Sequence, residues 1–300
     1  MIQDIEPKHL YNQFKNLTPQ AGDLVFYFEG SKLLAKNEEG VISYPTFKTF
    51  CDAVVAQKKR PAEEVYTFIY LLAVDDVKYF LAMPTDGTET LSGILKEDKT
   101  EPFLAGYAMT GVNIFRLAKP KETAFAAITA YHLYGWYRDN RYCGRCGKLM
   151  KQDTKERMLR CDDCHNMVYP KICPAVIVAV TDGDRILLTK YAGRDYTNYA
   201  LNAGFAEIGE TIEQTVHREI MEEVGLKVKN LRYYKSQPWA LSGTLLIGFF
   251  CELDGDDKIT LEEDELATAE WFHAKDLDIE DDGVSLTREM MLKFKHDHTK

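Results

Sequence analysis

The sequence GFAEIGETIEQTVHREIMEEVGL, which occupies residues 204–226, decides how the second half of this chain is interpreted. Thr211 is followed three residues later by Gln214, the spacing of a capping box at a helix N-terminus. Gly225 is the residue type that ends helices in a left-handed conformation. The segment therefore predicts a helix over about 212–224.

Acidic and apolar side chains occupy adjoining faces of this predicted helix. At about 100° per residue, Glu219, Glu222 and Glu223 fall within about 100° of arc. Aliphatic side chains recur at helical spacing beside them, at Ile212, Val216, Ile220 and Val224. Since Glu223 lies within the edge of the apolar stripe, the carboxylates border the core.

A carboxylate cluster at the border of a core is unfavourable unless a cation accompanies it. Two carboxylates about 4 Å apart repel by roughly 4 kcal/mol at an effective dielectric constant of about 20. Oxygen ligands from several glutamates suit Mg²⁺ or Mn²⁺, which commonly bridge carboxylates to substrate phosphates. Arg218 adjoins Glu219 and can hold a carboxylate by paired hydrogen bonds. The alternative interpretation is a solvated acidic helix face.

The glycine, glutamate and arginine positions of this segment follow a known pattern without a departure. In chain order they are Gly204, Glu210, Arg218, Glu219, Glu222, Glu223 and Gly225. This spacing resembles the Nudix box, the signature of hydrolases that act on a nucleoside diphosphate linked to another group. The resemblance implies an enzyme with a Nudix α/β/α sandwich and a mixed sheet, in which Glu210 braces the loop before the helix.

The Nudix resemblance also implies roles for individual residues. Glu219, Glu222 and Glu223 would bind Mg²⁺ or Mn²⁺, and Arg218 would orient these carboxylates. Glu265, in the downstream segment Glu-Asp-Glu-Leu, would join the metal cluster. Either Glu265 or one of the three glutamates would act as general base, while the metal polarises the pyrophosphate and lowers the pKa of a bound water.

Two cysteine pairs lie upstream of the box, at Cys143 and Cys146 and at Cys161 and Cys164, with fourteen residues between the pairs. Four thiolates about 2.3 Å from one ion satisfy tetrahedral zinc and leave no open position, so the site would be structural. The surrounding residues are too polar to bury a core of their own, and bound zinc can replace one. We therefore predict one structural Zn²⁺ per chain, in preference to a redox dithiol or four buried thiols.

Length and composition bound the kind of protein. A chain of 300 residues predicts about two domains, and 45% hydrophobic with 28% charged residues is ordinary for a globular protein. The net charge of −10 argues against a surface built mainly to neutralise nucleic-acid phosphates. The sequence shows neither a run of about 18 apolar residues nor a signal peptide, and its cysteines are odd in number. We expect a cytoplasmic protein.

The chain pattern predicts a mixed α+β and α/β architecture in three parts. Residues 1–140 form a β-rich N-terminal domain that ends in a helix, residues 141–170 a zinc ribbon and residues 171–300 the Nudix domain. In the first part we predict strands at 23–29, 66–74, 78–83 and 111–117, turns at Glu39-Gly40 and Asp86-Gly87, and a helix at 121–137. In the last part we predict strands at 172–180, 185–191, 228–234 and 245–253.

This order of parts resembles the NADH pyrophosphatases, a Nudix subfamily that carries a second signature, Ser-Gln-Pro-Trp-Pro-Phe-Pro-any-Ser, after the box. Here Ser236-Gln237-Pro238-Trp239 is intact, but the next five residues are Ala-Leu-Ser-Gly-Thr. The resemblance implies substrate contacts by Gln237, Trp239 and Thr244, the last in place of the serine. Tyr169 and Phe205 match aromatic positions that contact the dinucleotide in relatives, with a plain core position as the alternative.

The resemblance implies metal-dependent hydrolysis of NAD(H) to NMN(H) and AMP, with attack of water at the AMP-side phosphorus. The same cleavage would remove an NAD cap from RNA. Because half of the second signature is altered, selectivity for NADH is expected to be looser. The alternatives are a Nudix hydrolase of ADP-ribose or diadenosine polyphosphates and a zinc-ribbon binding protein that senses a nucleotide. The resemblance also implies a homodimer.

Overall fold

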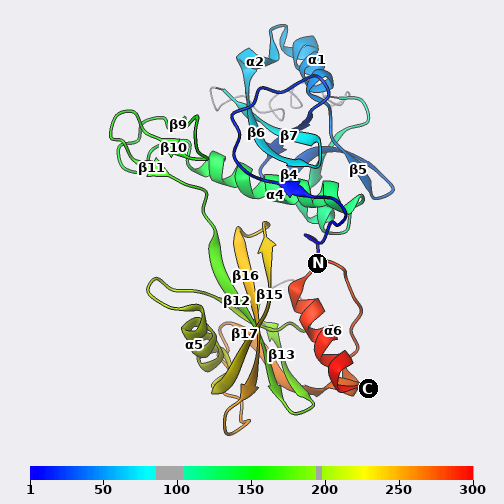
Figure 1. The fold of residues 1–300 in the computed structure, drawn as a ribbon, viewed down its shortest axis with the longest axis vertical. Helices are drawn as coiled ribbons and strands as arrows, with labels where there is room; N and C mark the ends of the chain where they lie inside the picture. Colours follow the sequence, from blue (N-terminus) through cyan, green and yellow to red (C-terminus); the bar gives the residue numbers. More distant parts are fainter. Residues whose placement is uncertain (86–103, 194–197, 300) are drawn as a thin grey trace. The chain divides into compact units, whose positions relative to one another are not determined.

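The computed structural model describes residues 1–85, 104–193 and 198–299, and the chain divides into two compact units (Figure 1). One unit comprises residues 4–171, and the other comprises residues 172–300 together with residues 1–3. Among the described helices, none is long and apolar enough to cross a membrane.

Outside the ribbon, the described part of the first unit contains two small sheets and a long helix. One sheet has the order β1-β6-β7-β2, formed by Leu10–Tyr11, Tyr66–Val74, Val77–Pro84 and Leu24–Phe26. The other joins β3, β4, β5 and β8, at Phe28–Glu29, Lys32–Glu38, Val41–Ser43 and Ala108–Gly111. Within residues 4–85 and 104–171 the helices are α1, α2, η1 and α4, at Phe47–Lys58, Ala62–Val65, Val112–Arg116 and Lys121–Asp139.

Most of the predicted elements of this unit are confirmed, and one is wrong. Strand β6 and the helix α4 lie where the pattern placed them, and Glu39 and Gly40 form the turn between β4 and β5. Residues 112–116 form the 3₁₀ helix η1 and not the predicted strand. Val112 and Phe115 are its buried residues, and their spacing of three suits a 3₁₀ turn better than the alternation of a strand. The predicted turn at 86–87 lies outside the described residues.

The ribbon is a three-stranded antiparallel sheet that belongs to the first unit. Its order is β11-β10-β9, formed by Met167–Val168, Leu159–Arg160 and Lys151–Gln152. Two arginines tie it to the rest of the unit through backbone carbonyls. Nη2 of Arg157 donates to the carbonyls of Asn12 and Leu71, and the guanidinium of Arg141 donates to those of Pro84 and Thr85.

The second unit is built on a mixed sheet, as predicted, and this sheet has six strands. Its order is β15-β16-β12-β13-β17, formed by Val228–Trp239, Thr244–Leu253, Cys173–Asp182, Arg185–Tyr191 and Leu266–His273. A further strand, β14 at Asn202–Phe205, pairs with β12. Strands β12 and β16 are parallel, and the other pairings are antiparallel. The helices are α5, η2 and α6, at Ile212–Val224, Ala274–Asp276 and Leu286–His298.

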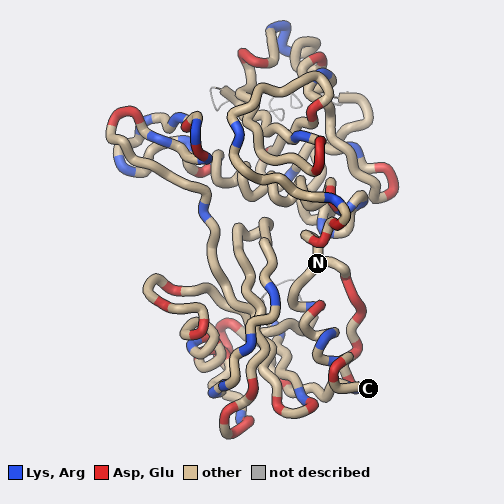
Figure 2. Tube along the Cα trace, viewed as in Figure 1, with Lys and Arg blue, Asp and Glu red and all other residues tan. Residues whose placement is uncertain are grey.

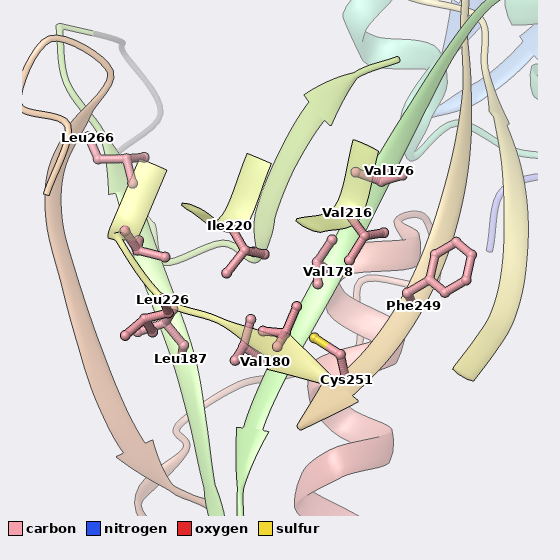
Figure 3. Packing of buried hydrophobic residues seen from close by; sticks show 12 residues of the cluster. Val176, Val178, Val180, Leu187, Val216, Ile220, Leu226, Phe249, Cys251 and Leu266 are labelled. Carbon is pink, nitrogen blue, oxygen red and sulfur yellow. The ribbon is translucent and has the colours of Figure 1, made fainter. Parts of the chain in front are cut away.

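Alternate residues of β12 enter two different cores, one on each face of the sheet. Val176, Val178 and Val180 pack with Val216, Ile220 and Val224 of α5 (Figure 3). Ile177 and Ala179 point to the other face and join a cluster that includes Leu286, Met290 and Phe294 of α6. This arrangement fixes the position of α5 on the sheet, and two residues of its acidic face, Glu219 and Glu223, are buried as well.

Candidate active site

The capping box at the start of α5 is confirmed. Oγ1 of Thr211 accepts from the backbone N–H of Gln214 over 3.2 Å, and Oε1 of Gln214 accepts from the backbone N–H of Thr211 over 2.8 Å. At the other end, Gly225 adopts the left-handed conformation with φ of 69°. These local signals fix the helix in the orientation that places Glu219 and Glu223 beside strand β14.

Arg218 lies at the centre of the acidic face and contacts three carboxylates. Its Nη1 donates to Oε1 of Glu219 and to Oε2 of Glu222, each over 2.8 Å. Its Nε and Nη2 donate to both oxygens of Glu210, over 2.6 and 2.9 Å. Nη2 also donates to the backbone carbonyl of Phe205 over 2.9 Å, which ties the helix to the end of β14.

Glu210 is held in its ionised form by this network. The hydrogen bond from Arg218, followed by one from the backbone N–H of Glu207, lowers the pKa of Glu210 to about 2. Its Oε2 also accepts from Oγ1 of Thr215 over 3.0 Å. Because Glu210 connects the loop before α5 to the middle of the helix, the geometry supports the bracing role expected of it.

Glu219 is buried beside a glycine that leaves room for its carboxylate. Only 8% of the residue is exposed. A β-carbon at Gly204 would lie 1.9 Å from Cδ of Glu219, so a larger residue there would displace the carboxylate. Burial raises the pKa of Glu219, although the hydrogen bond from Arg218 opposes that shift, and the charges of Glu222 and Glu265 add to it. Glu265 therefore lies within electrostatic range of Glu219.

Glu223 contacts a side chain that the sequence pattern did not identify. Its Oε2 accepts from Nδ2 of Asn202 over 2.6 Å, and only 3% of Glu223 is exposed. Asn202 belongs to β14, so the hydrogen bond joins the strand to α5. A lone asparagine carries no spacing signal, and its partner is 21 residues later in the chain.

The donor set of this face fits a hard divalent cation. It consists of carboxylate oxygens, which Mg²⁺ and Mn²⁺ prefer. Two further observations agree. The missing side chain at Gly204 leaves room for the carboxylate of Glu219, and Oδ1 of Asn202 is buried without a hydrogen-bond partner among the described residues. Glu219 and Glu222 both contact Arg218, which also pairs with Glu210, so its single positive charge offsets only part of the acidic charge of this face.

The four cysteines of the ribbon form the cluster expected of a zinc site. Their sulfur atoms all lie within 4.8 Å of one another, and Sγ of Cys143 is 3.5 Å from Sγ of Cys164. A tetrahedral site with bonds of about 2.3 Å separates its sulfurs by roughly 3.8 Å, so little movement is needed. Although burial opposes it, hydrogen bonds from the backbone of Arg145 and Cys146 lower the pKa of Cys143 to about 6.

The residues predicted to contact the substrate differ in their exposure and in the unit to which they belong. Phe205 is 54% exposed beside Arg218, and Trp239 pairs with Thr244 across the β15–β16 hairpin. Thr244 is buried, and its hydroxyl lies 2.7 Å from that of Ser242. Tyr169 is 53% exposed in the other unit, where its hydroxyl donates to Glu156.

Gln237 has a structural position that the signature did not suggest. It is fully buried; its Nε2 donates to the carbonyl of Val284 over 2.8 Å, and its Oε1 accepts from the N–H of Leu286 over 2.8 Å. Nε2 also donates to Gln3. These bonds fix the start of α6 and leave the side chain without exposed surface for a substrate.

Two family models match the chain. Residues 171–294 match the NUDIX domain, and residues 138–169 match the NADH pyrophosphatase zinc ribbon domain. The second unit therefore carries a Nudix domain, and the four cysteines lie in a zinc ribbon of the NADH pyrophosphatase type, which supports a structural zinc ion.

Several similar proteins share one name, NAD-capped RNA hydrolase NudC. The chain is 42% identical over 164 residues to the NAD-capped RNA hydrolase NudC of Actinobacillus succinogenes, covering 52% of this chain and 62% of that protein. It is 38% identical over 159 residues to the protein of that name from Haemophilus influenzae strain PittGG, covering 52% and 60%. The chain thus spans about three-fifths of the length of these curated relatives.

A crystal structure of a NUDIX hydrolase from Nitrosomonas europaea aligns with 53% of this chain and 92% of that one, at 20% identity and a TM-score of 0.45.

Proposed function

We propose that this chain, which carries a Nudix domain and the zinc ribbon of NADH pyrophosphatases, hydrolyses the pyrophosphate bond of NAD(H) to NMN(H) and AMP. The observation that carries the proposal is the set of box glutamates on α5, which Arg218, Gly204 and Asn202 hold in place beside β14. The relatives named NAD-capped RNA hydrolases support NAD as the reacting group.

The proposed reaction needs Mg²⁺ or Mn²⁺ at this face. When bound, the ion polarises the pyrophosphate and lowers the pKa of a water molecule. Glu219 and Glu223 are buried and fixed, so they are suited to hold it, while the exposed Glu222 completes the face. Arg218 keeps the carboxylates oriented and Glu265, on the segment before β17, is our choice for the base that takes a proton from the attacking water.

Aromatic side chains would bind the two bases of the dinucleotide. Phe205 is exposed beside the glutamate face, and Trp239 stands at the end of β15. We propose that these rings stack on the substrate, with Tyr169 as a further contact. Thr244 is buried and its hydroxyl is hydrogen-bonded to Ser242, so we assign it to the support of the β15–β16 hairpin. We assign Gln237 to the support of α6, because its amide is fully engaged with that part of the fold.

One assay separates the enzymatic alternatives. The purified chain is incubated with Mn²⁺ or Mg²⁺ and, in separate reactions, with NADH, NAD⁺, ADP-ribose and diadenosine polyphosphates, and the products are identified by chromatography. We expect NMNH and AMP from NADH and loss of both products in Glu222→Gln. If NADH stays intact while another substrate is cleaved, the NADH assignment is wrong and the Nudix chemistry stands. If nothing is cleaved and Glu222→Gln alters only nucleotide binding, the sensing alternative is correct.

NAD-capped RNA is a second proposed substrate, and the excess of basic residues in the zinc ribbon supports it. Residues 138–169 contain eight Lys or Arg and five Asp or Glu, whereas the chain as a whole carries −10 (Figure 2). A locally basic ribbon suits contact with nucleic-acid phosphates. The test compares cleavage of NAD-capped RNA and NADH as salt rises: RNA cleavage should fall steeply and NADH cleavage should not. If cleavage of NAD-capped RNA and of NADH depend equally on salt, the ribbon does not contact the RNA phosphates.

We further propose that the protein is cytoplasmic and forms a homodimer. We also propose that each chain has three parts, with boundaries at residues 140/141 and 170/171. The seven cysteines are free of disulfides, which suits a reducing compartment. Light scattering on the purified chain tests the dimer, and a mass of 34.4 kDa would contradict it. Limited proteolysis tests the boundaries, since cleavage should concentrate near them.

A further inference from the structure

A buried amide contacts the most deeply buried of the box glutamates. Asn202 is 1% exposed, and its Nδ2 donates to Oε2 of Glu223 over 2.6 Å. The amide nitrogen is the atom that faces Glu223, and the carboxylate oxygen accepts from it. The hydrogen bond spans the gap between β14 and α5, so it fixes Glu223 from the strand and not from its own helix.

The other end of the same amide has no partner. Oδ1 of Asn202 is buried, and the described residues supply no hydrogen bond to it. A buried acceptor without a donor is unfavourable, and in folded proteins such atoms are normally satisfied by an ordered water or by the surroundings of an ion. Within the part of the chain that the structure describes, this is the one such side-chain atom next to a box glutamate.

We propose that Asn202 is a positioning residue that orients the carboxylate of Glu223 for a divalent cation. This rests on the proposed function, in which Glu223 is a metal ligand. A hydrogen bond from a fixed donor restricts how a ligating carboxylate can rotate, and such supporting partners contribute to metal affinity. A hydrated cation would also bring O–H donors to the unpartnered Oδ1.

A purely structural amide makes a different prediction. If Asn202 only stabilised the contact between β14 and α5, its removal would lower stability and leave cation affinity unchanged. If it positions Glu223, cation affinity falls even in protein that remains folded, and the effect depends on the carboxylate of Glu223.

The test measures Mn²⁺ binding by titration calorimetry without substrate, beside thermal unfolding of the metal-free protein. Asn202→Leu keeps the branched shape and removes both polar atoms; we expect Mn²⁺ to bind about 10- to 100-fold more weakly. Asn202→Ser, which is shorter, gives the same readout if the leucine variant does not fold. The matched control is Thr181→Val, which removes a buried 2.9 Å hydrogen bond to the carbonyl of Cys251 elsewhere in the sheet. It should lower stability and leave Mn²⁺ affinity at the wild-type value.

A double-variant cycle with Glu223→Gln separates the positioning role of Asn202 from the role of Glu223 as a metal ligand, on which it rests. In the Glu223→Gln background, Asn202→Leu should weaken Mn²⁺ binding no further. If Glu223→Gln alone leaves Mn²⁺ affinity unchanged, the assignment of Glu223 as a ligand is wrong and the proposed function loses that residue. If Glu223→Gln weakens binding and Asn202→Leu does not, only the role of Asn202 is overturned.

Discussion

Gly204 lies directly against the carboxylate of Glu219: a β-carbon at residue 204 would stand 1.9 Å from Cδ of the glutamate. The carboxylate is also held by Nη1 of Arg218 and is largely buried, so it has little freedom to move aside. A glycine is needed at residue 204 because it leaves room for the carboxylate of Glu219. Its backbone does not require a glycine, since its φ is not in the left-handed region.

Gly204→Ala should displace Glu219 and leave the fold in place. A misplacement of about 1 Å at a reacting centre can reduce the rate by about 10²-fold, and we expect a loss of that size in kcat for NADH with Mn²⁺. The control is Gly135→Ala in α4, where no described atom outside the adjoining residues and the helix's own backbone lies within 4 Å of the added carbon. That variant should keep its kcat and gain about 0.4–1 kcal/mol of stability. Wild-type kcat in Gly204→Ala would contradict the steric argument.

The Glu210–Arg218 pair should make stability depend on pH in the acid range. The pKa of Glu210 is about 2 in the folded chain and 4.5 in its ordinary state. Since the folded pKa is the lower one, the pair favours the folded state above about pH 4.5 and loses this effect as the pH falls towards 2. Melting temperatures of Glu210→Gln should therefore fall less steeply over that range than those of the wild type. Glu213→Gln, on the same helix, should follow the wild type.

The residues predicted well from sequence are those whose signals are local. Helix α5 was predictable because its cap, its apolar stripe and its terminal glycine all lie within one short segment. The cysteine cluster was predictable because zinc requires a fixed spacing of ligands. The strand predicted at 111–117 was wrong because apolar residues three apart were interpreted as a short alternating run.

Contacts between distant segments could not be predicted in this way. Asn202 meets Glu223 across a strand and a helix, and one polar residue has no periodicity to reveal that contact. Gln237 belongs to a motif that indicated a substrate contact, yet its amide binds backbone atoms 47 and 49 residues later, at the start of α6. Both contacts depend on how the sheet and helices pack, which the local sequence does not contain.

Zinc removal should unfold the ribbon. Cys161→Ser replaces a fully buried thiol, and the remaining three sulfurs cannot complete a tetrahedral site. Because structural zinc binding contributes on the order of 10 kcal/mol or more, we expect loss of the zinc and of the ribbon's protection from proteolysis. Elemental analysis and limited proteolysis measure both. Cys51→Ser, outside the cluster in the same unit, should retain one zinc per chain.

Trp239→Ala should weaken NADH binding more than it slows the reaction. Stacking of a base on an aromatic side chain is worth about 1–3 kcal/mol, which corresponds to a rise in KM of about 5- to 150-fold. Steady-state kinetics separate KM from kcat. Tyr233→Ala removes an exposed aromatic residue from the same strand and should leave both constants unchanged. Equal effects of the two variants would place Trp239 outside the binding site.

Glu265→Gln should reduce kcat strongly, whereas Glu263→Gln should not. Both residues are exposed on the segment before β17, but Glu265 is the one whose charge raises the pKa of Glu219. Loss of a general base slows proton transfer by about 10²- to 10⁴-fold, and we expect kcat of Glu265→Gln to fall by a factor in that range. Removing the neighbouring charge should also lower the pKa of Glu219. If the two variants have the same kcat and pH profile, the base must be sought among the three glutamates of α5.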